Sequence, residues 1–558
     1  MVINTLKDLA LRSVEKFSDN VAFSMLNGES VTYNEFRVRM TVIQDLLQNA
    51  GLNSGDKVAL LSSNMPNWSV CYFAVVSAGM TIVPILPDFS GPELDMIIQH
   101  SEAKAILVSD KLFTRLSKET ISKLNVVIRT KNLSVISQKV EEKGSFTDPK
   151  SEDIAAIIYT SGTTSKPKGV MLSHYNLVRQ VEVLDSLFLM NADDVCLSVL
   201  PLSHTYECSL GMILPFSKGG QSVYLDRPPT ATVLMPALKR VRPTIMLIVP
   251  LLIEKIFRSQ VQAKFNSTAF LRTICKATFI RNIFYKVAGN RLMKVFGGRV
   301  RFLGVGGAKL DINTEEFLAV SKFPYAIGYG LTETAPVLAG AIPGKTRLGS
   351  TGPMAKGLKV RLENINPETG QGEVVVKTPC AMVGYYKNPE ATKEVFTEDG
   401  WFRTGDLGEL DKDGYLYIKG RLKNMILGPS GENIYPEEIE SVLNSHVYIS
   451  DSVVTEQEGR LVALVHFNTV EIENLFKEWR DEFRDSWESR MSEWEARKDA
   501  MKKEIQSYVN SKVNRFSKIS EVVEQEEEFV KTPTHKIKRF LYNKSGKGNN
   551  GAADAKNA

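Results

Sequence analysis

Residues 159–170, YTSGTTSKPKGV, combine hydroxyls, glycines and two lysines directly after the apolar run at 154–158. Glycines let a backbone turn its N–H groups toward an anion, and the hydroxyl and ammonium groups add further donors. The P-loop pattern G-x-x-x-x-G-K-[ST] does not fit, because Gly169 and Val170 follow Lys168. The segment therefore predicts either a phosphate-binding loop of another kind or an ordinary polar turn.

Later segments show the same mixture of glycine or proline with polar side chains. In chain order they are PLSHTYE (201–207), VGGAKL (305–310) with GYGLTETAP (328–336), GWFRTGDLGELDKDGYLYIKGRLKNMI (400–426) and PTHKIKR (533–539). Alone, their single residues say little. An aspartate such as Asp406 usually just caps its turn. Lys536 in a basic tail is commonly a solvated charge, and His204 beside a turn is often a satisfied polar residue.

Together, and in this order, the motifs resemble those of the AMP-forming acyl-CoA synthetases. These enzymes belong to the adenylate-forming superfamily, which also holds amino-acid adenylation domains and luciferases. The resemblance runs from about residue 5 to residue 541. It implies an enzyme that uses ATP, Mg²⁺ and coenzyme A. A carboxylate would attack the α-phosphate to give an acyl-adenylate and pyrophosphate, and the thiol of coenzyme A would then displace AMP.

The same resemblance implies how ATP would be bound. The 159–170 loop would cover the β- and γ-phosphates, Tyr329 would lie against the adenine, and Thr332 would contact the α-phosphate. Glu333 and Thr160 would bind Mg²⁺, which prefers hard oxygen ligands. The implied cofactor-binding residues are Ser161, Gly162, Thr163, Thr164, Lys168, Gly306, Gly307, Ala308, Gly328, Tyr329, Gly330, Thr332, Asp406, Arg421, Lys423 and Gly431.

Four residues are implied as catalytic: Lys536, Glu333, Thr160 and His204. Lys536 would bridge the substrate carboxylate and the α-phosphate while negative charge develops. His204 would gate the site near that carboxylate. Asp406 would accept both ribose hydroxyls, since a carboxylate accepts two hydrogen bonds at once, and Arg421 would support the ribose and phosphates.

The family rotates a small C-terminal domain between its two half-reactions, about a hinge just after the GRxK motif. Here the hinge would lie at Lys423 and Asn424, where the family often has Asp at the second position. The loop at 428–435 would face the thioester chemistry, with Gly431 letting the pantetheine pass. His535 replaces the more usual small or apolar residue before the terminal lysine.

The elements that must position these residues follow from hydrophobic periodicity. Apolar runs such as KAILVSD, DIAAIIYT, TIMLIVP and RVRFLGVGG alternate with helical patterns, which predicts α/β layers with largely parallel sheets. The uncharged stretch 58–87 is long enough to span a bilayer, but its prolines and asparagines favour a buried βαβ unit. After about residue 340, short alternating strands predict a small antiparallel barrel or sheet.

The expected fold class is α/β. Residues 1–422 would form a large adenylation domain of two α/β subdomains and a small β-barrel-like subdomain. Residues 423–545 would form a mobile α+β domain with a helix at 436, a hairpin, and a long amphipathic helix at 475–509. The apolar stripe of that helix is Trp479, Phe483, Trp487, Met491 and Trp494, which we expect to pack on the same domain. Residues 546–558 should be a disordered tail.

Charge and cysteines limit the partners and the compartment. The net charge of +5 over 558 residues gives no reason to expect nucleic acid. Five scattered cysteines and an N-terminus without a long apolar core indicate a cytoplasmic protein with free thiols. Residues 255–301, from Lys255 to Arg301, contain no acid. This suits peripheral contact with the inner face of an anionic membrane or, equally, a solvated basic face or a site that attracts anionic substrates.

PLSHTYE resembles the long-chain branch of the family, so the expected activity is ligation of a long-chain fatty acid to coenzyme A. Two alternatives stay open. The acyl group could pass to the phosphopantetheine of an acyl carrier protein instead, which a basic surface would suit. A lipid- or nucleotide-binding homologue without turnover is disfavoured, because Thr160, Glu333, Asp406, Arg421 and Lys536 are all present.

Overall fold

Helix α3 (Pro66–Ser77) explains the long uncharged stretch near the N-terminus. Every residue of this helix is buried, as expected for a helix that is apolar all round. It joins strands β3 (Lys57–Leu61) and β4 (Thr81–Pro84), which pair in parallel. The predicted βαβ unit is therefore confirmed. No helix in the part of the chain that the structure describes has both the length and the apolarity that a membrane crossing requires.

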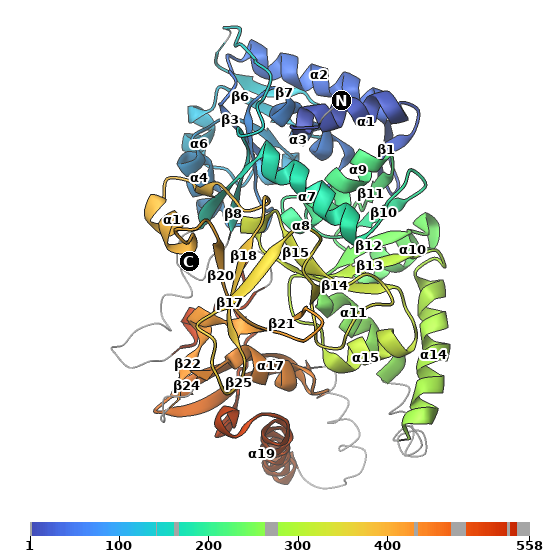
Figure 1. Ribbon diagram of the computed structural model, residues 1–558, viewed down its shortest axis with the longest axis vertical. Helices are drawn as coiled ribbons and strands as arrows, with labels where there is room; N and C mark the ends of the chain where they lie inside the picture. The colour runs from blue at the N-terminus through green and yellow to red at the C-terminus, as the bar shows by residue number, and fades with distance from the viewer. Residues whose placement is uncertain are drawn as a thin grey trace.

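This is a computed structural model, shown in Figure 1, with helices and strands labelled along the chain. It describes residues 3–140, 142–160, 167–262, 277–428, 433–469, 472, 487–532 and 536–543. Several predictions fall outside these residues: those for Ser161, Gly162, Thr163, Thr164, Gly431, His535 and the tail at 546–558.

Two large sheets build the N-terminal part, and each has eight strands within the described residues. The first has the order β15 (Val337–Gly340), β14 (Tyr325–Gly330), β13 (Phe302–Val305), β12 (Ile245–Ile248), β10 (Val195–Ser198), β11 (Gln221–Tyr224), β1 (Val21–Met25), β2 (Ser30–Thr32). The second has the order β19 (Gly384–Tyr385), β9 (Lys168–Ser173), β8 (Ile154–Thr160), β4, β3, β5 (Ala103–Val108), β6 (Val126–Arg129), β7 (Val135–Gln138). Central strands pair in parallel, as the sequence predicts, whereas strands at or near the edges pair antiparallel.

Successive residues of each strand face opposite sides of its sheet, and one side of each large sheet packs against a shared core. In β3, Val58 and Leu60 belong to the cluster that also holds Phe23 and Ile245 of the first sheet. Ala59 of the same strand faces a separate outer cluster. Successive residues of a strand point to opposite faces, so both faces of each sheet are covered. Helices contributing to the shared core include α1 (Leu6–Phe17), α2 (Tyr33–Asn49), α3 and α7 (His174–Leu187).

The remaining helices of this part connect the strands or cover the outer faces. Within the described residues they include α4 (Gly91–Ser101), α5 (Asp110–Phe113), α6 (Lys118–Lys123), α8 (Thr205–Glu207), the π-helix Cys208–Ile213, α9 (Leu214–Lys218), α10 (Ala231–Val241), α11 (Pro250–Phe257), the π-helix Arg258–Gln262, α14 (Thr278–Val295), α15 (Ile312–Val320) and α16 (Pro389–Val395).

A third sheet follows and is antiparallel, which confirms the small antiparallel barrel or sheet predicted after about residue 340. Its order is β16 (Gly352–Pro353), β21 (Tyr415–Arg421), β20 (Phe402–Leu410), β18 (Gly372–Lys377), β17 (Lys359–Glu363). It lies between the two large sheets and the C-terminal unit in Figure 1. The strands that carry Asp406 and Arg421 are therefore next to each other, at the junction of the two parts of the chain.

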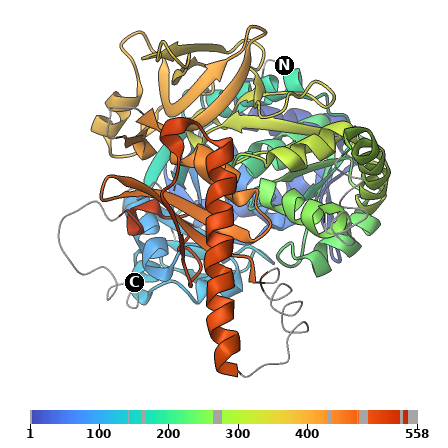
Figure 2. The same ribbon diagram turned by 90° about the horizontal axis from the view of Figure 1, so that it is seen from below.

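The C-terminal unit has its own core. Helix α17 (Pro436–Asn444) packs on the hairpin of β24 (Ile449–Gln457) and β25 (Arg460–Phe467), and β26 (Glu521–Glu524) adds in parallel. The helix start and the hairpin are as predicted. Figure 2 shows α19 (Trp487–Lys512) as the long helix of this unit.

Helix α19 ends at Lys512, slightly beyond the predicted end at 509. Its Met501, Ile505 and Val509 pack into the C-terminal core. The predicted tryptophan stripe is not tested, because residues 479 and 483 and the side chains of Trp487, Met491 and Trp494 lie outside what the structure describes.

Candidate active site

An ion pair between a buried carboxylate and a partly exposed arginine lies in the candidate site. Asp406 on β20 lies opposite Arg421 on β21 in the antiparallel register, and Arg421 Nε is 2.7 Å from Asp406 Oδ1. The hydroxyl of Tyr329, at the end of β14, donates to Asp406 Oδ2 at 2.6 Å. Burial raises the pKa of the Asp406 carboxyl, and the Arg421 charge opposes that rise. An ionised carboxylate has about four acceptor positions, so Asp406 keeps capacity for hydroxyl donors such as those of a ribose.

Glu333 lies just beyond β14, in the one-turn 3-10 helix Thr332–Thr334. Its Oε1 accepts a 2.9 Å hydrogen bond from the Tyr385 hydroxyl. Thr332 Oγ1 is 3.4 Å from Thr205 Oγ1, so the 328–336 and 201–207 motifs meet here.

Strands β8 and β9 hold the two ends of the 159–170 loop. Thr160, the last residue of β8, is opposite Lys168, the first of β9, and its hydroxyl is 3.5 Å from the Lys168 carbonyl. The Lys168 ammonium lies over the Tyr385 ring, 4.8 Å from its centroid. The loop therefore begins and ends beside the residues that surround Glu333.

Lys536 reaches this site from the C-terminal unit. Two hydrogen bonds join it to Thr532: Thr532 N donates to Lys536 O at 2.7 Å, and Lys536 N donates to Thr532 Oγ1 at 3.1 Å. The side chain keeps access to solvent, yet the surrounding protein and then the charge of Arg421 lower the pKa of its ammonium, while Asp406 and Glu333 raise it.

The site therefore carries an excess of positive charge. The charges of Arg421 and Lys168 both act on Lys423, and Arg421 and Lys423 act on Lys536. Set against these four cations are the carboxylates of Asp406 and Glu333. This balance suits a polyanion such as a nucleoside triphosphate together with a carboxylate substrate.

His204 is a helix cap in the structure, and its proposed gating role stays a prediction. Its Nδ1 accepts from Tyr206 N at 3.2 Å and so caps the short helix α8. Burial, and then the nearby charge of Lys536, lowers the pKa of His204 to about 4. The imidazole is therefore neutral at pH 7 and lies on the Lys536 side of the site.

Gly306 follows β13 where a large side chain approaches the backbone. A Cβ at Gly306 would lie 3.2 Å from the Tyr206 ring, and Gly307 has φ +88°, which glycine adopts without strain. Close packing of Tyr206 and the backbone conformation therefore account for the two glycines, while their predicted part in cofactor binding stays a prediction.

Comparison with known proteins gives the family. The model for AMP-binding enzymes matches residues 11–386. The chain belongs to the family of AMP-binding enzymes. It is similar to long chain acyl-CoA synthetase 1 of Arabidopsis thaliana, 30% identical over 509 residues, which cover 80% of this chain and 76% of that one. It is also similar to a chloroplastic long-chain-fatty-acid–[acyl-carrier-protein] ligase of the same plant, AEE15, 27% identical over 84% of this chain and 77% of that one.

Solved structures confirm the fold of this AMP-binding enzyme. The ATP-bound MatB from Rhodopseudomonas palustris matches 97% of the chain and 98% of its own, with a TM-score of 0.74 and 23% identity. MenE from Bacillus subtilis in complex with ATP and a magnesium ion matches 95% of the chain and 98% of its own, with a TM-score of 0.74 and 20% identity.

The residues at Glu333 fit Mg²⁺ that arrives with ATP. Mg²⁺ is commonly held by one or two carboxylates together with substrate phosphates and water. Glu333 and Thr160 offer hard oxygen donors. The described residues contain no group of three or more His, Cys, Asp or Glu able to hold a metal on their own. In this AMP-binding enzyme, Glu333 and Thr160 are thus the residues proposed to hold the ion, which would neutralise phosphate charge.

The sequence analysis missed two residues, Tyr385 beside Glu333 and the buried Glu207. Tyr385 lies in GYYKNPE, which has no catalytic signature. Glu207 ends the PLSHTYE motif, where a polar residue is expected at a surface, but it is fully buried. For Tyr385, the pair of adjacent tyrosines was the only signal in the sequence. For Glu207, nothing in the sequence indicates burial.

The four cysteines that the structure describes, Cys71, Cys196, Cys208 and Cys380, are free and buried. This agrees with the predicted free thiols at these positions.

Proposed function

We propose that this protein ligates a long-chain fatty acid to coenzyme A through an acyl-adenylate. The observation that carries the proposal is the meeting of Lys536, from the C-terminal unit, with the Asp406–Arg421 pair and Glu333 of the N-terminal part. The named activities of the relatives, acyl-CoA synthetases among them, support the choice of substrate class.

In the first half-reaction, a fatty-acid carboxylate oxygen attacks the α-phosphorus of ATP and pyrophosphate leaves. Lys536 would stabilise the negative charge that develops between the two reactants. Asp406 would fix the ribose, Tyr329 the adenine, and Arg421 and Lys168 the phosphates. The bound Mg²⁺ would supply charge neutralisation at the phosphates.

In the second half-reaction, the sulfur of coenzyme A attacks the acyl carbon, AMP leaves and the thiol proton is released. We propose that the 423–545 domain rotates about Lys423 and Asn424 between the two halves. The separate hydrophobic core of this unit supports an independent body. Asn424 donates to Glu437 Oε1 at 2.5 Å, so the hinge residue is tied to the moving side by this bond.

Pyrophosphate release from Mg·ATP tests the proposal directly. We expect turnover to rise from acetate through octanoate to palmitate and oleate, and to require coenzyme A. Release of a single equivalent that coenzyme A does not accelerate would contradict the ligase and favour a carrier-protein acceptor. That alternative has support from the acyl-carrier-protein ligase among the relatives, and acyl carrier protein added to the assay distinguishes the two.

A membrane surface is the second part of the proposal, as the source of the fatty acid. Helix α14 exposes Phe279, Ile283 and Val287, which recur at a spacing of four residues, with exposed fractions of 76%, 48% and 48%. Lys286 and Lys294 are exposed on the same helix. An apolar stripe beside basic residues suits an anionic bilayer interface. Arg281 is excluded from this role by its ion pair with Glu316.

Sedimentation with phosphatidylglycerol vesicles at moderate salt tests this contact. The double variant Phe279→Ser, Ile283→Ser should lose most of the bound fraction, because it removes the inserted apolar area. Val38→Ser, at an exposed apolar position of helix α2, is the matched control and should bind as the wild type does. Equal binding of all three proteins would refute the α14 surface.

A further inference from the structure

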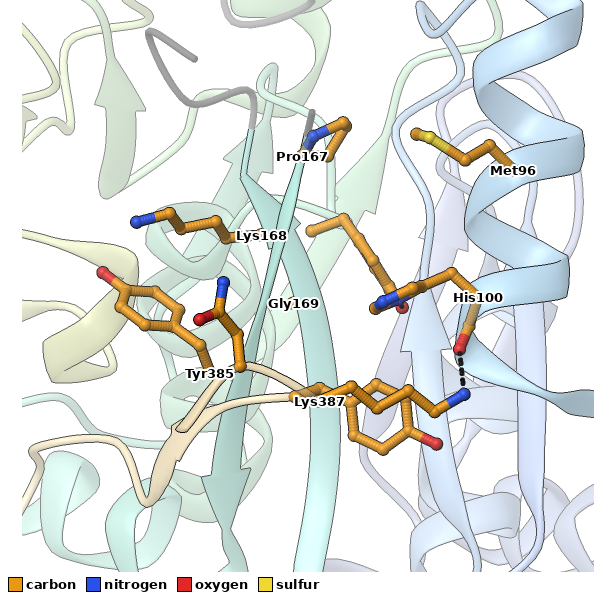
Figure 3. Close-up of a pocket in the computed structure, with 10 residues that line it drawn as sticks. Met96, His100, Pro167, Lys168, Gly169, Tyr385 and Lys387 are labelled. Atoms are coloured by element: carbon orange, nitrogen blue, oxygen red, sulfur yellow. Dashed lines mark hydrogen bonds between the residues drawn. The ribbon is translucent and has the colours of Figure 1, made fainter. Parts of the chain in front are cut away.

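Strand β19 lies beside the strand on which the phosphate loop ends. Tyr385 is opposite Val170 in the antiparallel pairing of β19 with β9. The pairing is extended by Val383 N to Met171 O at 2.9 Å and Tyr386 N to Gly169 O at 2.7 Å. In Figure 3, Lys168 at the start of β9 and Tyr385 lie next to each other across this edge.

The Tyr385 side chain touches two groups of the candidate ATP site at once. Its hydroxyl donates to Glu333 Oε1 at 2.9 Å, and its ring lies under the Lys168 ammonium at 4.8 Å. The side chain is only 7% exposed, so its position is set by packing. The backbone adds a third link, because Met382 N donates to Glu333 O at 2.7 Å.

Glu333 is thus held through both its backbone and its carboxylate by residues 382–385. A metal-binding carboxylate needs a partner for the oxygen that does not face the ion, since a free carboxylate rotates. Such partners typically change metal affinity by about 10–100-fold when removed. Tyr385 supplies this partner and, through Lys168, connects it to the end of the phosphate loop.

We propose that Tyr385 is a positioning residue that orients Glu333 for Mg·ATP and couples it to Lys168. The inference rests on the proposed role of Glu333 in holding Mg²⁺. Tyr385 itself contacts no reacting atom in this assignment. It acts by fixing one carboxylate oxygen, which leaves the other for the ion.

The adjacent Tyr386 provides a matched control. It belongs to the same segment, and its hydroxyl donates to Glu102 at 2.8 Å, on the opposite side of the segment from Glu333. Tyr385→Phe and Tyr386→Phe therefore each remove one phenolic hydroxyl. The first hydroxyl lies inside the site and the second lies outside it. Phenylalanine keeps the ring, so packing and the contact with Lys168 are retained.

Calorimetric titration with ATP at a series of Mg²⁺ concentrations is the deciding measurement. We expect Tyr385→Phe to raise the Mg²⁺ concentration needed for half-maximal tightening of ATP binding by about 10-fold. Binding of ATP without Mg²⁺ and the Tm should stay unchanged. Tyr386→Phe should match the wild type throughout. In the pyrophosphate assay, the KM for Mg·ATP should rise in Tyr385→Phe while kcat recovers at high Mg²⁺.

Identical Mg²⁺ dependence in the two variants overturns the inference. A lowered Tm in Tyr385→Phe with kcat reduced equally at every Mg²⁺ concentration also overturns it, because that result marks a structural role. These outcomes are separate from failure of the proposed function. If no fatty acid is adenylated by the wild type, the ligase proposal fails, while the calorimetric comparison still decides the role of Tyr385.

Discussion

Lys536→Ala will lower the rate of acyl-adenylate formation by about 10²–10³-fold, the usual cost of removing one group that stabilises developing negative charge. The affinity for ATP will change little, because Asp406, Arg421 and Lys168 remain to hold the ribose and phosphates. ATP–pyrophosphate exchange with palmitate measures the first quantity, and calorimetric titration with Mg·ATP measures the second. A rate loss with retained ATP binding is the signature of a group that acts in the transition state.

Two other lysines make the result specific. Lys538 is on the same segment, and its backbone N–H donates to the Val530 carbonyl. The Lys538→Ala protein should catalyse ATP–pyrophosphate exchange at the wild-type rate. Lys423 is a second cation inside the site. If Lys423→Ala loses exchange and Lys536→Ala does not, the catalytic assignment moves to Lys423.

The thioester-forming half-reaction provides a second test of the Lys536→Ala variant, because only adenylation should be slowed. Lys536 is proposed to enter the site only in the adenylation pose. Palmitoyl-adenylate supplied to Lys536→Ala should therefore react with coenzyme A at close to the wild-type rate. Equal loss in both half-reactions would show that the substitution damages the site in general.

The sequence could predict the elements because each has a local signature. The absence of charge over 58–87, the Pro at the start of α17 and the apolar runs of β24 and β25 are properties of neighbouring residues. Their partners in the fold are also close in the chain, as in β3–α3–β4. Motif order was enough to indicate the family, because whole segments were recognisable.

The contacts within the site could not be predicted in the same way. Pairing of Asp406 with Arg421 depends on the register of β20 and β21, which contains a shift between Leu407 and Gly408. Tyr385 meets Glu333 from 52 residues away in the chain, and no periodicity shows such a pair. Burial of Glu207 likewise follows from tertiary packing, which places the π-helix after α8 against β10.

Glu207→Gln is expected to stabilise the protein increasingly as the pH rises from 5 to 8. Glu207 is fully buried, and neither carboxyl oxygen has a hydrogen-bond partner among the described residues. Gly211 makes room for it, since a Cβ there would lie 2.5 Å from Glu207 Oε1. Burial raises the pKa of this carboxyl to about 8. The folded protein therefore keeps a proton that the unfolded chain releases near pH 4.5.

The sign of the pH effect follows from that difference. A group whose pKa is higher in the folded protein than in the unfolded chain contributes to stability. This contribution is complete below the unfolded pKa and is lost as the pH rises toward the folded pKa. The wild type should lose roughly 1.4 kcal/mol per pH unit from this group between about 4.5 and 8. Glutamine cannot titrate, so the Glu207→Gln protein avoids this loss.

Thermal unfolding of both proteins at pH 5, 6.5 and 8 measures the effect as a growing difference in Tm. The exposed Glu398 supplies a control, and Glu398→Gln should show no such growth. A constant difference for Glu207→Gln would mean that the carboxyl is ionised in the folded protein.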